Sequence, residues 1–222
     1  MSVWVSALLG IVISIVIMVV VSRRVLKKLE PVLLQAQKLA QARQLKLAIQ
    51  MLEGLLPYNR WQLMLASQVH AQIGVFHYAD KNEIKAIEHL EKGSARNADG
   101  RMILAAILFR KKEFDRACEI MDLTIKLNKK QVLLYNAYAF MLNQIEKNNE
   151  AIAILQKGLK INPDNEATRD NLLRLQNGKK MYLQPFGMTW YSLQLEKPPI
   201  SMMQDQFAGR AGFRPNKKVK SR

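Results

Sequence analysis

The sequence has few of the residues from which catalytic and metal sites are built. Its 222 residues include one cysteine and three histidines. A single cysteine excludes an internal disulfide framework and any Cys-rich zinc or iron–sulfur module, and it suits a reducing compartment. The motifs G-x-S-x-G and H-E-x-x-H are absent, and no glycine-rich phosphate loop follows a strand pattern. We therefore expect no enzyme, no metal and no cofactor, and we interpret His70 and His77 as ordinary helix residues and Cys118 as a buried, inert thiol.

Acidic residues are also scarce, and the excess of basic charge lies at the two ends of the chain. Lys and Arg number 34 against 18 Asp and Glu, which gives a formal net charge of +16. Residues 178–222 carry a net charge of +7, whereas residues 61–97 are neutral. A nucleic-acid-binding domain is expected to concentrate basic charge on its folded part. Because the central part is the least basic, nucleic acid is disfavoured as the main partner.

Residues 1–22 are predicted to form a transmembrane anchor. The 19 residues from Val3 to Val21 include no charged side chain, and a helix of that length spans about 28 Å, close to the hydrocarbon thickness of a bilayer. A cleavable signal peptide is the main alternative, but no basic side chain precedes the apolar run and no small-residue cleavage site follows it. The positive-inside rule places the N-terminus outside and the C-terminal domain in the cytoplasm, because a basic juxtamembrane segment, 23–31, follows the span. The cations that flank the membrane are Arg23, Arg24, Lys27 and Lys28.

Small residues recur every four positions within this span, at Ser6, Gly10 and Ser14. Such spacing allows two membrane helices to approach closely. It favours homo- or hetero-association through the membrane helix, and chance spacing of common residues is the alternative.

Residues 32–177 have helical periodicity and an internal repeat. Apolar residues recur at intervals of three and four, glycine and proline fall mainly at junctions, and no stretch alternates like a strand. Two series with the same +4, +3 spacing lie 34 residues apart: Ala117, Met121 and Thr124, then Ala151, Leu155 and Gly158. A third series, Ala86, Leu90 and Gly93, has the same spacing.

This pattern resembles the tetratricopeptide-repeat (TPR) family, whose unit of 34 residues is a helix–turn–helix with small residues where its helices cross. Residues 132–165 match best, with Tyr135 at the aromatic position, Ala139 at the small position of the first helix and Pro163 at the end. Residues 98–131 and 67–97 match less well, and residues 32–66 are degenerate. The resemblance implies an all-α solenoid of helical hairpins over 32–177, with a closing helix over 166–177 and an irregular tail after it.

In TPR arrays the first helices of successive pairs line a concave groove, so the resemblance also implies a partner-binding surface. That surface would be largely apolar with one cation, which suits an apolar helix or an extended aromatic segment better than an acidic peptide. Core packing is the alternative for several of its members. The predicted groove residues are Gln68, Val75, Tyr78, Met102, Phe109, Arg110, Leu133, Asn136, Phe140 and Asn143.

The tail, residues 178–222, is aromatic in its first half and basic at its end. Phe186, Trp190 and Tyr191 make the segment too aromatic for a simple disordered linker. We expect these side chains to contact either the chain's own groove or a partner. The terminal GRAGFRPNKKVKSR is expected to be a solvated tail, with a membrane or protein contact as the alternative.

Together these patterns predict a non-catalytic, membrane-anchored TPR scaffold that binds a protein partner at the cytoplasmic face of a membrane. The resemblance favours a bacterial inner membrane. One alternative is a structural subunit of a larger membrane complex for secretion, motility or envelope assembly. Another is a membrane tether for RNA or ribosomes that acts through the basic tail.

Overall fold

The computed structural model describes residues 31–56 and 63–200, and the regular elements in this part of the chain are all helices. Over these residues, no helix combines the length and the apolarity that crossing a bilayer requires. The predicted span 1–22 and its small residues lie outside the described residues, as do Arg23, Arg24, Lys27 and Lys28. The all-helical prediction for 32–177 is confirmed within the described ranges.

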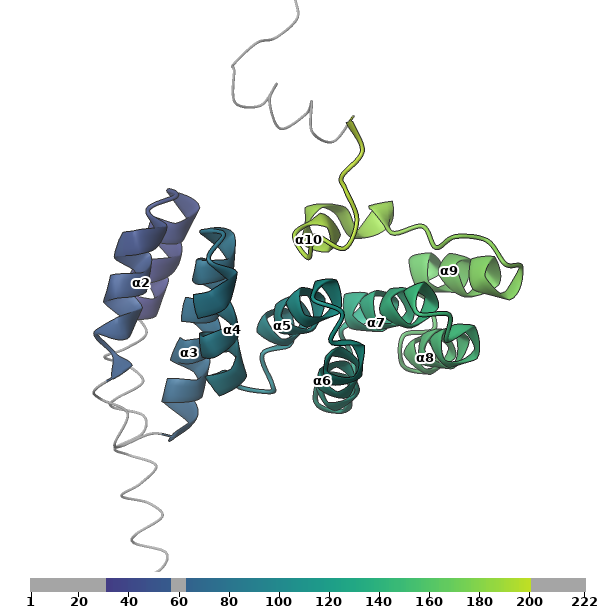
Figure 1. The fold of residues 1–222 in the computed structure, drawn as a ribbon, viewed down its shortest axis with the longest axis horizontal. Helices are drawn as coiled ribbons and strands as arrows, with labels where there is room; N and C mark the ends of the chain where they lie inside the picture. Colours follow the sequence, from purple (N-terminus) through teal and green to yellow (C-terminus); the bar gives the residue numbers. More distant parts are fainter. Residues whose placement is uncertain (1–30, 57–62, 201–222) are drawn as a thin grey trace, which may run out of the picture. The chain divides into compact units, whose positions relative to one another are not determined.

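The chain divides into two compact units, with the boundary between Leu134 and Tyr135, near the start of α7. Both units are built from successive helices (Figure 1). The first contains helix 31–41, α2 (Leu45–Glu53), α3 (Leu63–Ala79), α4 (Glu83–Lys92), α5 (Ala98–Arg110) and α6 (Phe114–Leu127). The second contains most of α7 (Val132–Gln144), then α8 (Asn148–Ile161), α9 (Glu166–Gln176), the 3₁₀ helix η2 (Gln184–Phe186) and α10 (Gly187–Tyr191).

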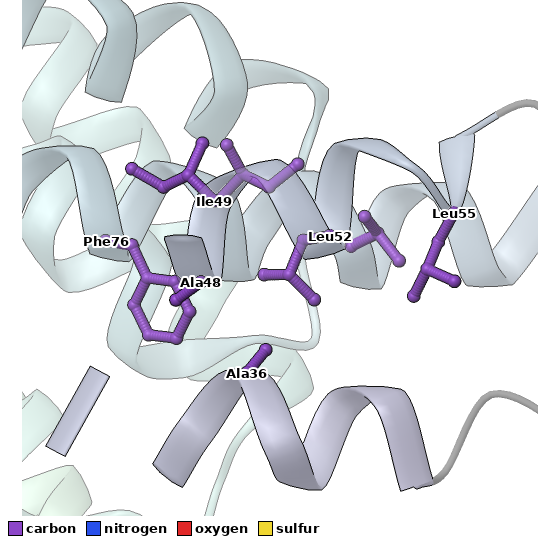
Figure 2. Packing of buried hydrophobic residues seen from close by; sticks show 8 residues of the cluster. Ala36, Ala48, Ile49, Leu52, Leu55 and Phe76 are labelled. Carbon is purple, nitrogen blue, oxygen red and sulfur yellow. The ribbon is translucent and has the colours of Figure 1, made fainter. Parts of the chain in front are cut away.

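The core of the first unit begins where helix 31–41, α2 and α3 pack together. Ala36 points from helix 31–41 toward Ala48 and Leu52 of α2 (Figure 2). All three are fully buried, and Phe76 of α3 belongs to the same cluster. The residues that the sequence assigned to a degenerate first repeat therefore form a real helix pair that packs on the next helix.

The turns inside the helix pairs share one backbone geometry. In the turn between α5 and α6, the Glu113 N–H donates to the Leu108 carbonyl and the Lys112 N–H to the Phe109 carbonyl, both at 3.0 Å. These two bonds define a Schellman motif, in which one residue adopts the left-handed conformation. Here that residue is Lys112, with φ of 65°. The equivalent residues of the other turns, also at positive φ, are Arg43, Lys81 and Glu146.

Replacing Lys112 by glycine should stabilise the protein. A left-handed conformation costs a residue with a Cβ about 1–2 kcal/mol, and glycine avoids most of that cost. We expect Lys112→Gly to raise the free energy of unfolding by about 0.5–1 kcal/mol in urea denaturation. Lys111, in the same turn at φ of −78°, is the matched control. Lys111→Gly should destabilise, and an equal response from both variants would contradict the assignment.

Small residues lie where helices approach most closely. A Cβ at Gly74 in α3 would lie 2.6 Å from Leu90 Cγ of α4, and a Cβ at Gly158 in α8 would lie 2.9 Å from Tyr135 Cγ of α7. Neither distance is compatible with van der Waals contact. The repeat pattern predicted a small residue at position 158, and the structure shows that the Tyr135 side chain requires it.

Candidate functional site

A pocket of about 320 Å³ opens on the first unit, and we call it the polar pocket because most of its lining residues are polar, although their apolar atoms also form part of the wall. Its walls come from helix 31–41, from the first half of α3 and from the connection between α4 and α5. Six of its seven lining residues are polar: Leu33, Gln37, Gln68, Gln72, Ser94, Arg96 and Asn97.

Backbone and capping bonds fix the pocket walls. The Ser94 N–H donates to the Ser67 carbonyl at 2.9 Å, which ties the α4–α5 connection to α3. Asn97 caps α5, because its side-chain oxygen accepts from the Gly100 N–H at 2.8 Å. A side-chain oxygen at this position satisfies one of the unpaired N–H groups at a helix start. The connection is therefore held at both ends, and it places Arg96 at the rim.

The pocket offers hydrogen-bonding groups that are not used by the part of the chain that the structure describes. Within residues 31–56 and 63–200, the side chains of Gln37, Gln68, Gln72 and Arg96 have no hydrogen-bond or ion-pair partner. A glutamine amide donates and accepts at once, which matches the N–H and C=O of an extended peptide. The Arg96 guanidinium adds a cation that can bind a carboxylate or a carbonyl. The site can therefore bind a polypeptide backbone.

The predicted groove cation is engaged elsewhere. Arg110 forms an ion pair with Glu83 and donates to the Tyr78 hydroxyl at 3.3 Å. Its guanidinium also lies 5.8 Å from the centre of the Tyr78 ring. Burial raises the pKa of Tyr78, and the hydrogen bond from Arg110 opposes that effect. These three side chains link α3, α4 and α5.

The other predicted groove residues of the first unit have varied environments. Gln68 lines the pocket. Val75 is half-buried against the core cluster, and Phe109 contacts Phe114 in a tilted arrangement with ring centres 5.0 Å apart. Met102 and Leu133 are buried. A groove role for these residues stays a prediction.

The predicted groove residues of the second unit make contacts within that unit. Asn136 is fully buried and donates to the Thr168 hydroxyl at 2.8 Å, while Asn171 donates to the Asn136 oxygen at 3.0 Å. This network joins α7 to α9. Asn143 donates to the side chain of Asn148 at 2.6 Å.

The aromatic part of the tail packs on the second unit. Trp190 is fully buried and meets Phe140 of α7 edge to face, with ring centres 4.9 Å apart. Its indole N–H donates to Glu196 at 2.9 Å. Tyr191 is buried and Phe186 is half-buried. Among the described residues the tail aromatics thus contact the chain itself, including one predicted groove residue.

Several pocket residues were not predicted from the sequence. Gln72 lies one helical turn after Gln68, and that i, i+4 spacing could have identified it. Arg96 and Asn97 lie in a connection, where helical periodicity gives no guidance. Cys118 is half-buried rather than buried. In the ranges that the structure covers, no three His, Cys, Asp or Glu side chains are placed to hold a metal ion together.

Neither a family model nor a curated protein matches the chain. Solved structures with a similar fold do match the chain. Two crystal structures of MamA superpose with TM-scores of 0.52 and 0.51 at 15% identity, covering 81% and 80% of this chain and 92% and 97% of theirs. The first TPR of Spaghetti (RPAP3), bound to the HSP90 peptide SRMEEVD, matches with a TM-score of 0.44 at 19% identity and covers 52% of this chain and 96% of that one. At these identities the likeness concerns the fold alone.

Proposed function

Because the chain has a TPR fold, we propose that it is a non-catalytic scaffold that binds a protein partner and holds it at the cytoplasmic face of a membrane. The observation behind this proposal is the polar pocket of the first unit. Its three glutamine amides and the Arg96 guanidinium have no partner among the described residues and face a common opening. Polar groups left free in this way can exchange their hydrogen bonds with water for bonds to a ligand, and no bond between the described residues has to break.

The partner segment is an extended peptide rather than an apolar helix. An apolar helix binds in a groove lined by apolar side chains, whereas Leu33 is the one apolar residue in this lining. An extended backbone presents N–H donors and C=O acceptors in alternation. The glutamine amides of helix 31–41 and of α3 can pair with both kinds of group. This differs from the apolar groove expected from the sequence, because the cation and several apolar residues of that set have partners within the fold.

The membrane part of the proposal rests on the sequence. The uncharged run from Val3 to Val21 is long enough to span a bilayer, and basic residues follow it. An anchored scaffold raises the local concentration of its partner at the membrane without any chemistry.

Site-specific crosslinking in cells tests the proposal. A photo-crosslinking amino acid at Gln72 should capture a discrete protein that sediments with membranes. The control site is Ile84, which is 79% exposed on α4 and outside the pocket. Arg96→Ala should reduce the Gln72 crosslink about tenfold, because a charge-assisted hydrogen bond contributes about 1.5–3 kcal/mol. Deleting residues 1–22 should move the crosslinked product to the soluble fraction.

Two results would reject parts of this proposal. Equal crosslinking from Gln72 and Ile84 would reject the pocket, and a product that stays with membranes after deletion of residues 1–22 would reject the anchor. A structural subunit would instead co-purify with a stoichiometric membrane complex that is lost on truncation after Ile200. That truncation leaves the packed aromatic segment intact.

A further inference from the structure

All three histidines of the chain meet between α3 and α4. His70 and His77 lie on α3 and His89 on α4, and we call these three residues the histidine cluster. The Nδ1 atoms of His70 and His89 are 3.1 Å apart. The ring centre of His89 lies 5.1 Å from that of His70 and 5.5 Å from that of His77.

The contact between His70 and His89 requires that at least one of the two rings is neutral. One Nδ1 must carry a proton and donate it, and the other must be free to accept. Protonating the acceptor removes its lone pair, so the hydrogen bond is lost and a positive charge appears beside a second ring. His77 adds a further constraint, because it is buried and neither of its ring nitrogens has a hydrogen-bond partner within the described residues. A charged His77 at this position would be unpaired and desolvated.

The side chains around the cluster do not neutralise such a charge. Burial lowers the pKa of all three histidines, and Lys92 lowers the pKa of His70 further. Lys85 acts in the same direction on the pKa of His77, and the other two histidines do so on the pKa of His89. Carboxylates act in the opposite direction without reversing these shifts: Glu88 of α4, Glu53 of α2 and Asp80, which follows α3.

The helices around the cluster cannot separate locally without disturbing the pocket. Gly74 of α3 lies directly against Leu90 of α4, so the two helices are in close contact beside the cluster. His70 lies on the same turn of α3 as Gln68 and Gln72, which line the pocket, but its side chain contacts His89 of α4. The connection after α4 is bonded to α3 through the Ser94 N–H. A movement of α4 away from α3 therefore moves two walls of the pocket apart.

We propose that the histidine cluster is an acid-sensitive contact that opens the α3–α4 hairpin and so releases the partner from the polar pocket. The part that concerns the partner rests on the proposed function. The contact holds α3 and α4 together at neutral pH, where its imidazoles are uncharged. On acidification the unfolded or opened hairpin takes up protons that the closed one excludes, so closure weakens. The stabilisation is complete above the unfolded pKa of about 6.5 and is lost as the pH falls through the lowered pKa values of the closed state.

Hydrogen exchange of the full-length protein tests the hairpin directly. Amide protection in α3 and α4 is compared between about pH 7.5 and about pH 5.5, corrected for the intrinsic pH dependence of exchange. The internal reference is α7–α9, which contains no histidine. We expect protection of α3–α4 to fall about tenfold more than that of the reference.

The matched variant is His70→Asn/His89→Asn, in which each amide takes the place of Nδ1 but does not titrate. This variant should lose clearly less of its α3–α4 protection than the wild type over the same pH range, and the loss that remains is the response of His77. If it does not fold, His70→Gln/His89→Gln replaces it. An equal loss in the wild type and the variant overturns the proposal.

The crosslink from Gln72 tests whether opening of the hairpin is coupled to the pocket. In the wild type this crosslink should weaken at least about fivefold at the lower pH, and in the double variant it should weaken less than about twofold, because His77 alone remains to respond. A wild-type crosslink that is insensitive to pH, while exchange shows an open hairpin, overturns the coupling to the pocket. If Gln72 gives no specific crosslink at either pH, the proposed function fails. The hydrogen-exchange result then still decides whether the hairpin responds to acid.

Discussion

Trp190→Ala is expected to lower the stability of the second unit by about 3–5 kcal/mol, the usual cost of removing a large buried aromatic side chain. Trp190 is fully buried although it lies in a helix of five residues that cannot be stable alone. Its edge-to-face contact with Phe140 contributes about 0.5–1.5 kcal/mol beyond burial. The bond from its indole N–H to Glu196 fixes the segment that follows. Denaturant unfolding followed by circular dichroism measures the loss.

Met188 in the same short helix supplies the control. Its side chain is 46% exposed, so Met188→Ala should change the stability by no more than about 0.5 kcal/mol. Trp190→Phe should lie between the two, since it keeps a ring against Phe140 and loses the N–H. If Trp190→Ala is as mild as Met188→Ala, the tail does not pack on α7 in solution.

For the tail, the sequence predicted that the aromatic segment contacts a surface, but it did not predict which surface. Its aromatic content indicated that the segment rests on something, because exposed aromatic side chains are costly. Composition does not say which surface covers them. That surface includes Phe140, about fifty residues earlier in the chain, and only a three-dimensional structure brings the two rings together. The two short helices of the segment also escaped prediction, since helices of three and five residues have no measurable periodicity.

The helix pairs were predictable because each one depends on local spacing. The closing helix expected over 166–177 is α9, Glu166–Gln176. The predicted groove was harder, because a polar residue on a helix does not reveal whether it faces solvent or a buried partner. Asn136 was assigned to the groove, and it bonds Thr168 and Asn171 inside the fold. Likewise His70 and His89 are 19 residues apart, and only the antiparallel packing of α3 and α4 makes them neighbours.

The packing of α3 on α4 predicts a large loss of stability on Leu90→Ala, and it predicts that the effect of Gly74→Ala depends on the side chain at position 90. Leu90 is almost fully buried, and its side chain also approaches Gly100 of α5. Leu90→Ala should therefore cost about 2–5 kcal/mol. Ile84→Ala on the exposed side of the same helix is the control, with an expected change within about 0.5 kcal/mol.

Gly74→Ala has two opposing effects. Alanine favours a helix over glycine by about 1 kcal/mol. In the wild type its methyl group would lie 2.6 Å from Leu90 Cγ and 2.8 Å from Leu90 Cδ2, and such overpacking costs about 1–3 kcal/mol. We expect Gly74→Ala to destabilise the wild type. In the Leu90→Ala background both of those atoms are gone and only the close approach to the backbone N of residue 90, at 3.0 Å, remains, so the same substitution should cost much less.

Urea denaturation of the two single variants and the double variant gives the coupling energy, which should be about 1–3 kcal/mol in favour of the double variant. Additive effects would mean that α3 and α4 relax apart easily at this crossing. In that case a charge on the histidine cluster could also be accommodated without opening the hairpin. The dependence of Gly74→Ala on the side chain at position 90 and the acid response therefore require the same property, which is that the contact between α3 and α4 beside Gly74 has no room to adjust.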